Sequence, residues 1–148
     1  MTLESWLHFF HLLGSMIWVG GTLVLSLVAG RVLSRQDPKE IREFAATLSF
    51  VGLRVQAPAV IALLVAGVWL VLARGGDFTP PWILIGLGAF AVAFVIGGGY
   101  LSRIAIQMAR AGDGVQAADL LGRWIIGVRV ILIILLVAVL DMVFKPGL

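Results

Sequence analysis

Two histidines, His8 and His11, are the side chains of this sequence best suited to bind a metal ion or a haem iron. They lie in the stretch HFFHLLGSMIWVGG, which contains no other ionisable side chain. Because they are three residues apart, they share one face of a helix. Imidazole is a common protein ligand of haem iron and also suits copper. The pair therefore predicts a cofactor or metal site near the start of the chain.

The face that carries His11 has little side-chain bulk beside the imidazole. Gly14, Trp18 and Gly21 follow His11 at helical spacing. The two glycines leave room for a flat group against the helix, and Trp18 would close one end of that space. A haem is one candidate for the flat group, with His11 as its ligand.

A copper site is the alternative use of the same region. Met142 and Asp141, near the end of the last apolar window, are expected at about the same depth as His8 and His11. Imidazole and thioether ligands both suit copper, and the carboxylate would assist. Two histidines on one face cannot bind opposite sides of one haem, so Met142 or nothing would be the second axial ligand. His8 is also explained as a headgroup-level residue, and His11 as a hydrogen-bond donor to a neighbouring helix.

Composition places these residues in a membrane protein. The chain has 148 residues, of which 61% are hydrophobic and 13% charged, and its mean hydropathy is +1.09. Soluble domains have about 25% charged residues, so this chain has too little polar surface to face water all round. The length fits one domain. Cysteine is absent, which excludes disulfides, iron–sulfur clusters and thiolate ligation.

Four apolar windows are long enough to cross a bilayer, which takes about 20 mainly apolar residues. They cover about residues 6–29, 49–73, 82–101 and 124–144. A backbone in lipid must satisfy its own hydrogen bonds, so each window is expected to be a helix. The sequence therefore predicts an all-α fold, an integral membrane four-helix bundle formed by residues 1–148 as a single domain.

Basic residues predict how the bundle is oriented. Nine of the eleven Lys and Arg residues lie in or just beyond the first and third linkers, and two lie at the other end. By the positive-inside rule the first and third linkers face the cytoplasm and both termini face outside. The start of the chain lacks a basic region and a cleavage site, so we expect no removable signal peptide. We expect a bacterial inner-membrane protein whose partners are the lipid bilayer and other membrane subunits or further copies, rather than nucleic acid.

The first linker contains the pattern of a helix start, DPKEIREF. Asp37 is suited to cap the helix, Pro38 to begin it, and Glu40 to complete a capping box. Apolar positions then recur at i, i+3, i+4 and i+7, at Ile41, Phe44, Ala45 and Leu48. We expect a short amphipathic helix that lies on the cytoplasmic membrane surface and leads into the second span.

Two arginines, Arg54 and Arg129, lie about five residues, or roughly 7.5 Å, inside the cytoplasmic ends of the second and fourth windows. A charge at the bilayer centre costs roughly 2.5–3.5 kcal/mol, so each needs a reason. One interpretation is that both reach back to the headgroups. The other is an arginine pair for a haem propionate or a lipid phosphate. Their depth differs from that of His11 by roughly 15 Å of an approximately 30 Å core.

Three stretches follow a known pattern in order and spacing. HLLGSMIWVGG has a histidine and, seven residues on, a tryptophan followed by a small residue and glycine, here His11, Trp18, Gly20 and Gly21. VQAPAVIALLVAGVWL has Pro58 and, nine residues on, Gly67. RVILIILLVAVLDMVFKP begins at Arg129. Together they resemble the four-span membrane proteins related to CopD-like copper-resistance proteins and HemJ-like protoporphyrinogen oxidases.

The resemblance implies a four-span fold and a haem or metal site. In the HemJ-like enzymes the matching first-span histidine ligates haem b, which implies His11 as the ligand here. The Asn-Glu pair that follows the final-span arginine in those enzymes is absent, as is their third-span lysine. Enzyme activity is therefore left open.

Three functions stay open from the sequence. The first is haem b binding for electron transfer or porphyrin handling. The second is copper binding or transport through His8, His11 and Met142. The third is a cofactor-free structural subunit of a larger membrane complex.

Overall fold

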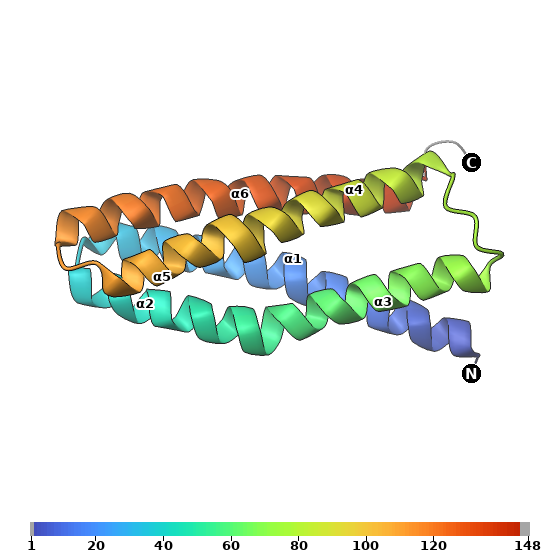
Figure 1. Cartoon of the computed structure of the whole chain (residues 1–148), viewed down its shortest axis with the longest axis horizontal. Coiled ribbons are helices and arrows are strands. Elements are labelled where there is room, and N and C mark those ends of the chain that lie inside the picture. Colours follow the sequence, from blue (N-terminus) through green and yellow to red (C-terminus); the bar gives the residue numbers. More distant parts are fainter. Residues whose placement is uncertain (1, 146–148) are drawn as a thin grey trace.

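The computed structural model describes residues 2–145 and consists of four long helical segments that run up and down (Figure 1). The helices are α1 (Leu3–Arg35), α2 (Pro38–Val51), α3 (Ala57–Ala73), α4 (Pro81–Val95), α5 (Ser102–Arg110) and α6 (Gly114–Phe144). The π-helical segment η1 (Gly52–Gln56) joins α2 to α3, and η2 (Ile96–Leu101) joins α4 to α5. Within residues 2–145 there is no strand, so the predicted all-α fold is confirmed.

Each segment is long and apolar enough to cross a membrane. The four candidates are Leu3–Arg35, Pro38–Ala73, Pro81–Arg110 and Gly114–Phe144, with mean hydropathies of 2.0, 2.3, 2.1 and 2.8 over their most apolar windows. They contain the four predicted windows. A helix of 36 residues, the length of the second segment, is about 54 Å long, whereas the hydrocarbon core is about 30 Å thick. The bundle is therefore longer than the membrane core.

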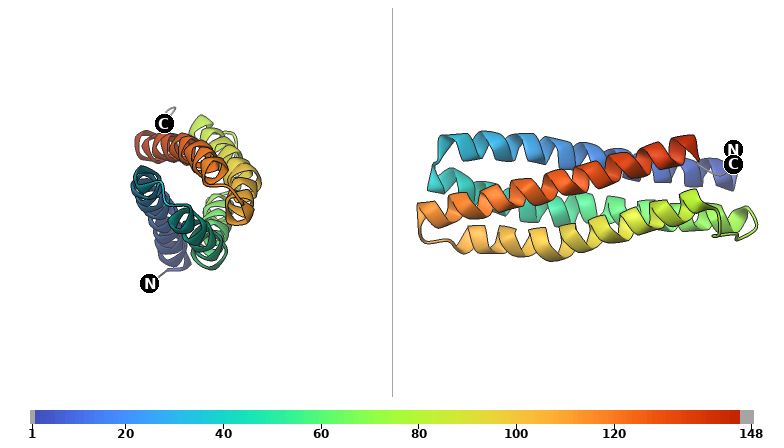
Figure 2. Two further views of the ribbon diagram at one scale, coloured as in Figure 1. Left: turned by 90° about the vertical axis from the view of Figure 1, so that its left-hand side faces the viewer. Right: turned by 90° about the horizontal axis from the view of Figure 1, so that it is seen from above.

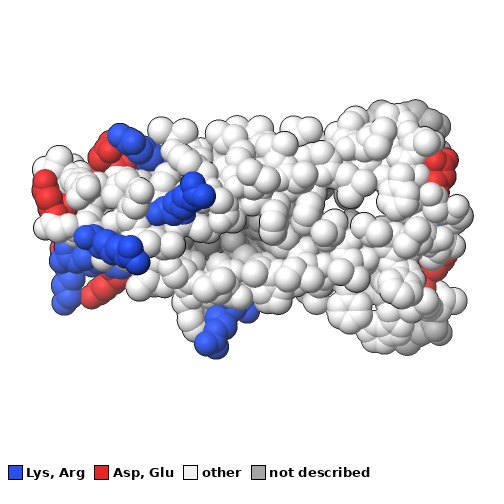
Figure 3. Space-filling model, viewed as in Figure 1, with Lys and Arg blue, Asp and Glu red and all other residues white. Residues whose placement is uncertain are grey.

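Charge is distributed unevenly along the bundle. The two ends of the chain lie at one end of the bundle, and seen end-on the four segments surround a common axis (Figure 2). Lys and Arg side chains gather toward the opposite end, among acidic groups (Figure 3). We call this the basic end. Its composition is what the positive-inside rule associates with the cytoplasmic side.

Local sequence explains where α2 and α6 begin. Asp37 accepts a hydrogen bond from the backbone N–H of Lys39 at 2.8 Å, and Asp113 accepts one from that of Val115 at 2.9 Å. Both aspartates are N-caps, since a short carboxylate satisfies an otherwise free helical N–H. Glu40 does not complete the predicted capping box, because it instead forms an ion pair with Arg35 at 2.8 Å.

The amphipathic helix of the first linker is α2, but it does not lie on a membrane surface. Its predicted apolar face, at Ile41, Phe44, Ala45 and Leu48, is buried. That face packs against α5 and α6, and the Phe44 ring meets Trp124 edge-on at 5.9 Å. Through η1 the helix continues into α3. α2 is therefore the upright beginning of the second segment, because protein rather than headgroups covers its apolar side.

The packing leaves one side of the bundle open. α1 packs on α3 and α6, α4 packs on α6, and α2 packs on α5. No Cα atoms of α3 and α4 lie within 8 Å of one another in the described chain, and Figure 1 shows these two helices as separate arms. α3, which follows η1, and α4, which precedes η2, are the two helices that lie apart. The bundle is thus closed at its basic end and open between α3 and α4.

The α1–α3 contact includes a close backbone approach at Gly14. A Cβ at this position would lie 2.7 Å from the Ala59 carbonyl oxygen and 3.0 Å from the Leu63 Cβ. Without a hydrophobic driving force between helices in lipid, such small residues allow tight dispersion contact. Gly20, on the same helix, has no atom within 4 Å of its corresponding position.

The packing of α2 on α5 gives the first prediction. Ile41 is fully buried, so Ile41→Ala should lower the free energy of unfolding by about 2–5 kcal/mol. The control Val115→Ala, at a position 78% exposed, should change it by less than about 0.5 kcal/mol. Denaturation of the full chain in detergent micelles measures both. Equal effects of the two substitutions would contradict the packed position of α2.

A matched pair of glycines on α1 gives the second prediction. Gly14→Ala should destabilise the protein by about 1–3 kcal/mol, because its methyl group forces α1 away from α3. Gly20→Ala should leave the stability unchanged or raise it by up to about 1 kcal/mol through helix propensity. The same unfolding measurement compares them. A Gly14→Ala variant as stable as Gly20→Ala would show that α1 and α3 are not in close contact there.

Candidate functional site

His11 is held by a hydrogen bond between two segments. Its Nδ1 lies 3.0 Å from the backbone carbonyl oxygen of Leu63 on α3. A carbonyl only accepts, so Nδ1 carries the proton and donates. In the neutral ring Nε2 is then the nitrogen with a free lone pair. The bond fixes the ring orientation and the tautomer at once.

Gly67 makes room for the His11 ring. A Cβ at this position would lie 2.9 Å from Cε1 and 3.0 Å from Nδ1 of His11. The first distance is shorter than real Cβ contacts and the second is tighter than nearly all of them, so a larger residue would force the ring to shift from its place beside the Leu63 carbonyl. In the sequence, Gly67 stands out only as part of a family resemblance. Its distance in sequence from His11 hid the contact.

The glycines beside His11 are used for helix packing. Gly14 lies against Ala59 and Leu63, as described above. Gly21 faces the side-chain amide of Gln56, whose Nε2 would be 3.1 Å from a Cβ at position 21. The room that was predicted for a flat group at these two glycines is therefore occupied by α3 and η1.

Trp18 connects the His11 face to the open side of the bundle. Its ring is buried and meets Phe90 of α4 edge-on at 5.4 Å. Phe90 in turn stacks on Phe94 at 6.0 Å. Trp18 thus packs toward α4, in the interior of the bundle, and links α1 to the residues of the opening between α3 and α4.

That opening is an apolar groove with a volume of about 420 Å³. Its lining comes from α3 and α4, with Val60, Ile61, Leu64, Leu87, Phe90, Ala91, Phe94 and Val95. Leu64 directly follows Leu63, whose carbonyl accepts the His11 bond. The His11 contact and the groove therefore meet on one turn of α3. The volume lies within the approximately 300–1,000 Å³ range of small-molecule sites.

His8 has a different environment from His11. Its Nδ1 lies 2.9 Å from the Glu4 carbonyl oxygen, and its Nε2 lies 3.1 Å from Nη2 of Arg74. An arginine only donates, so Nε2 accepts from Arg74 and Nδ1 donates to Glu4. Both nitrogens of His8 are used, which leaves no lone pair for a metal. The Arg74 contact was missed because it spans 66 positions of sequence.

Met142 and Asp141 complete the predicted copper set, and the structure does not assemble that set. The Met142 methyl group packs on Gly86 of α4, at 3.1 Å from the position of a Cβ. Asp141 is 9% exposed, and its Oδ2 has no hydrogen-bond partner within the described chain. Among residues 2–145 no three His, Asp or Glu side chains gather as a metal-binding group. His8, His11 and Asp141 therefore do not form such a group within the described chain.

Arg54 and Arg129 lie on the outside of the bundle. Both side chains are exposed, and the Arg54 guanidinium lies 5.8 Å from the Phe50 ring centre, on the same helical segment. The structure does not bring either arginine to His11. Their placement suits side chains that reach back to the headgroups.

Outside the spans, one carboxylate in the α3–α4 loop is locally stabilised. The Thr79 hydroxyl donates to Asp77 at 2.7 Å and the Thr79 backbone N–H at 2.9 Å. These two hydrogen bonds, the hydroxyl first, lower the pKa of Asp77 below its ordinary value. Its stabilising effect on this loop is present above that ordinary value and is lost as the pH falls through the lowered pKa.

Comparison with known proteins agrees with the fold. No curated protein and no solved structure matches the chain. A family model described as "Predicted integral membrane protein (DUF2269)" matches residues 5–146. That range includes His11, Trp18, the groove and all but the first residues of the four membrane segments. The finer resemblance to CopD-like and HemJ-like proteins stays a prediction. The chain belongs to the DUF2269 family of predicted integral membrane proteins.

Proposed function

We propose that this integral membrane protein binds haem b through Nε2 of His11, for electron transfer or porphyrin handling. The observation that carries the proposal is the 3.0 Å bond from His11 Nδ1 to the Leu63 carbonyl. Metal-ligating histidines almost always donate their other ring N–H to a carbonyl, carboxylate or water, which fixes the tautomer. His11 has this arrangement. His8 does not, because Arg74 occupies its Nε2.

The residues around His11 suit the ligation of haem iron. The residues predicted to hold the propionates do not lie beside them. The donor set is a single neutral imidazole, which is the proximal ligand of many haem proteins. Gly67 keeps the ring flush with α3, so the ligand cannot rotate without losing its hydrogen bond. The predicted propionate partners Arg54 and Arg129 are exposed on the outside of the bundle, so they do not form part of this proposal. When bound, haem would supply one-electron redox chemistry.

The groove between α3 and α4 supports the proposal with an apolar space on the same turn of α3. Its side chains are apolar, and Phe90 with Phe94 presents stacked aromatic surface. Such a surface suits the hydrophobic face of a porphyrin. Because the groove opens at the side of the bundle, a lipid-soluble ligand can enter from the membrane. His11 would orient the ligand, and Trp18 would exclude water from the interior side.

Copper is a weaker alternative for physical reasons. It would need ligands that converge, and His8 has no free nitrogen while Met142 lies against Gly86. No observation in the described chain favours the cofactor-free structural subunit over haem binding. We therefore retain haem as the function to test first.

The proposal predicts how two histidine variants differ in their visible absorption. The purified full chain, produced with an ample haem supply, should show a Soret band that shifts on reduction. His11→Ala should lose at least about 90% of that band per mole of protein, because the iron loses its only protein ligand. His8→Ala is the matched control, one turn away on the same helix, and should keep the band.

Two further measurements make the result interpretable. Helix content and elution volume of each variant show whether loss of the band reflects loss of the fold. Metal analysis of the same samples reports copper. A colourless wild-type protein, or equal bands in His11→Ala and wild type, would overturn the proposal, and stoichiometric copper in a colourless protein would support the alternative.

A further inference from the structure

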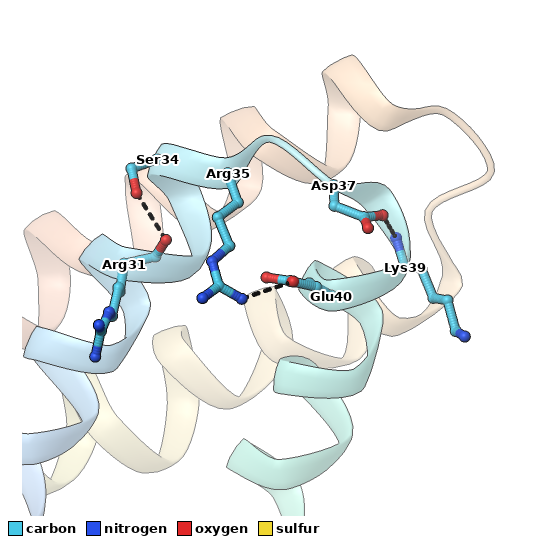
Figure 4. A network of polar contacts seen from close by, with 6 residues as sticks. All are labelled: Arg31, Ser34, Arg35, Asp37, Lys39 and Glu40. Atoms are coloured by element: carbon cyan, nitrogen blue, oxygen red, sulfur yellow. Dashed lines mark hydrogen bonds and ion pairs between the residues drawn. The ribbon is translucent and has the colours of Figure 1, made fainter.

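A second cavity lies at the basic end, between the last turns of α1 and the start of α2. Its volume is about 260 Å³, and it is lined by Val28, Arg31, Val32, Arg35 and Glu40. It is separate from the His11 region and from the groove, because it shares no residue with either. Figure 4 shows its charged side chains, with Arg31 and Arg35 one turn apart on one face of α1.

The charged groups of the cavity are not equivalent. Nη1 of Arg35 forms an ion pair with Oε1 of Glu40 at 2.8 Å, which ties α1 to α2 and fixes one wall. Arg31 forms no ion pair within residues 2–145. Two guanidinium groups and one carboxylate leave one net positive charge in the cavity. That charge is on Arg31, which is exposed and free to bind an anion.

The cavity lies where the apolar part of α1 ends. Val28 and Val32 are its apolar lining, and Val28 is 42% exposed. The predicted first span ends just after Val28, and Arg31 begins the charged last turns of α1. A residue pair of this kind, with a valine on the membrane side and an arginine one turn further, matches the boundary between acyl chains and phosphates.

We propose that this cavity binds the headgroup of an anionic phospholipid. The Arg31 guanidinium donates in a fork to the lipid phosphate, the geometry that makes arginine well suited to phosphate oxygens. The first part of an acyl chain lies over Val28. The Glu40 carboxylate disfavours a second negative charge deep in the cavity. Its own charge is balanced by Arg35, so the positive charge of Arg31 stays available. A zwitterionic lipid leaves the net positive charge of the cavity unmatched, so it binds less tightly.

Specific binding must be separated from attraction to the whole basic end. Arg110, at the end of α5, is exposed at the same end and lines neither cavity. Diffuse attraction depends on the summed charge of the basic end, so a basic residue outside the cavity contributes to it as much as Arg31 does. Arg110→Gln therefore removes the same charge as Arg31→Gln and serves as the matched control.

The test titrates the full chain in detergent with phosphatidylglycerol or phosphatidylcholine. Native mass spectrometry measures the bound lipid at each concentration, which gives the apparent affinity for each lipid. Wild-type protein should retain phosphatidylglycerol at least about fivefold more tightly than phosphatidylcholine. Arg31→Gln should weaken phosphatidylglycerol binding by about fivefold or more, and Arg110→Gln by less than twofold. Glu40→Gln should tighten it, because it removes the carboxylate and frees Arg35.

Three results would overturn the proposal. Equal weakening by Arg31→Gln and Arg110→Gln would mean diffuse attraction only. Equal retention of the two lipids would exclude selectivity for an anionic headgroup. Displacement of phosphatidylglycerol by millimolar inorganic phosphate would mean that the cavity binds free phosphate. Arg31 is exposed, so its substitution should leave the fold intact, and helix content checks this for every variant.

Discussion

The close approach of α1 to α3 is the contact on which the rest of this structure depends. Gly14 lets the two backbones meet, and at that separation the His11 ring can reach the Leu63 carbonyl. A larger side chain at position 14 or 67 would separate the helices or displace the ring. Helix packing in lipid depends on such close contact, because the surrounding acyl chains are as apolar as the side chains. The geometry of the candidate site is therefore a consequence of how the bundle is packed.

The half-open shape of the bundle follows from how each segment divides its contacts. α1 is committed to α3 and α6, and α4 to α6, and within the described chain no Cα atoms of α3 and α4 lie within 8 Å of one another. At the basic end α2 and α5 close the ring through a core that includes the fully buried Ile41, Met108 and Leu121. The π-helical segments η1 and η2 lie at the two places where closed and open halves join. Such segments are rare and often occur at functional sites, which agrees with a groove that begins beside them.

Much of the fold could be predicted from the sequence because its signals are local. Runs of apolar residues identify the membrane segments, and Asp37 identifies the start of α2. The apolar face of α2 was also predicted correctly, whereas its partner was not. An amphipathic pattern shows that one face avoids water, and it does not distinguish headgroups from another helix. For the same reason Gly14 and Gly21 indicated room beside His11 without indicating that α3 and Gln56 would occupy it.

The candidate site shows what a non-local contact adds to sequence reasoning. The sequence singled out His11 but not its partner, since Leu63 contributes only a backbone carbonyl and no side-chain pattern marks it. A hydrogen bond that merely links two membrane helices needs only a donor, and such bonds average about 0.6 kcal/mol. A serine or asparagine would supply that donor from a less specialised side chain. The imidazole adds a second nitrogen whose lone pair the structure leaves free while it fixes the ring. A structural role therefore explains the Leu63 bond but not the choice of histidine, whereas the proposed ligand role would explain both.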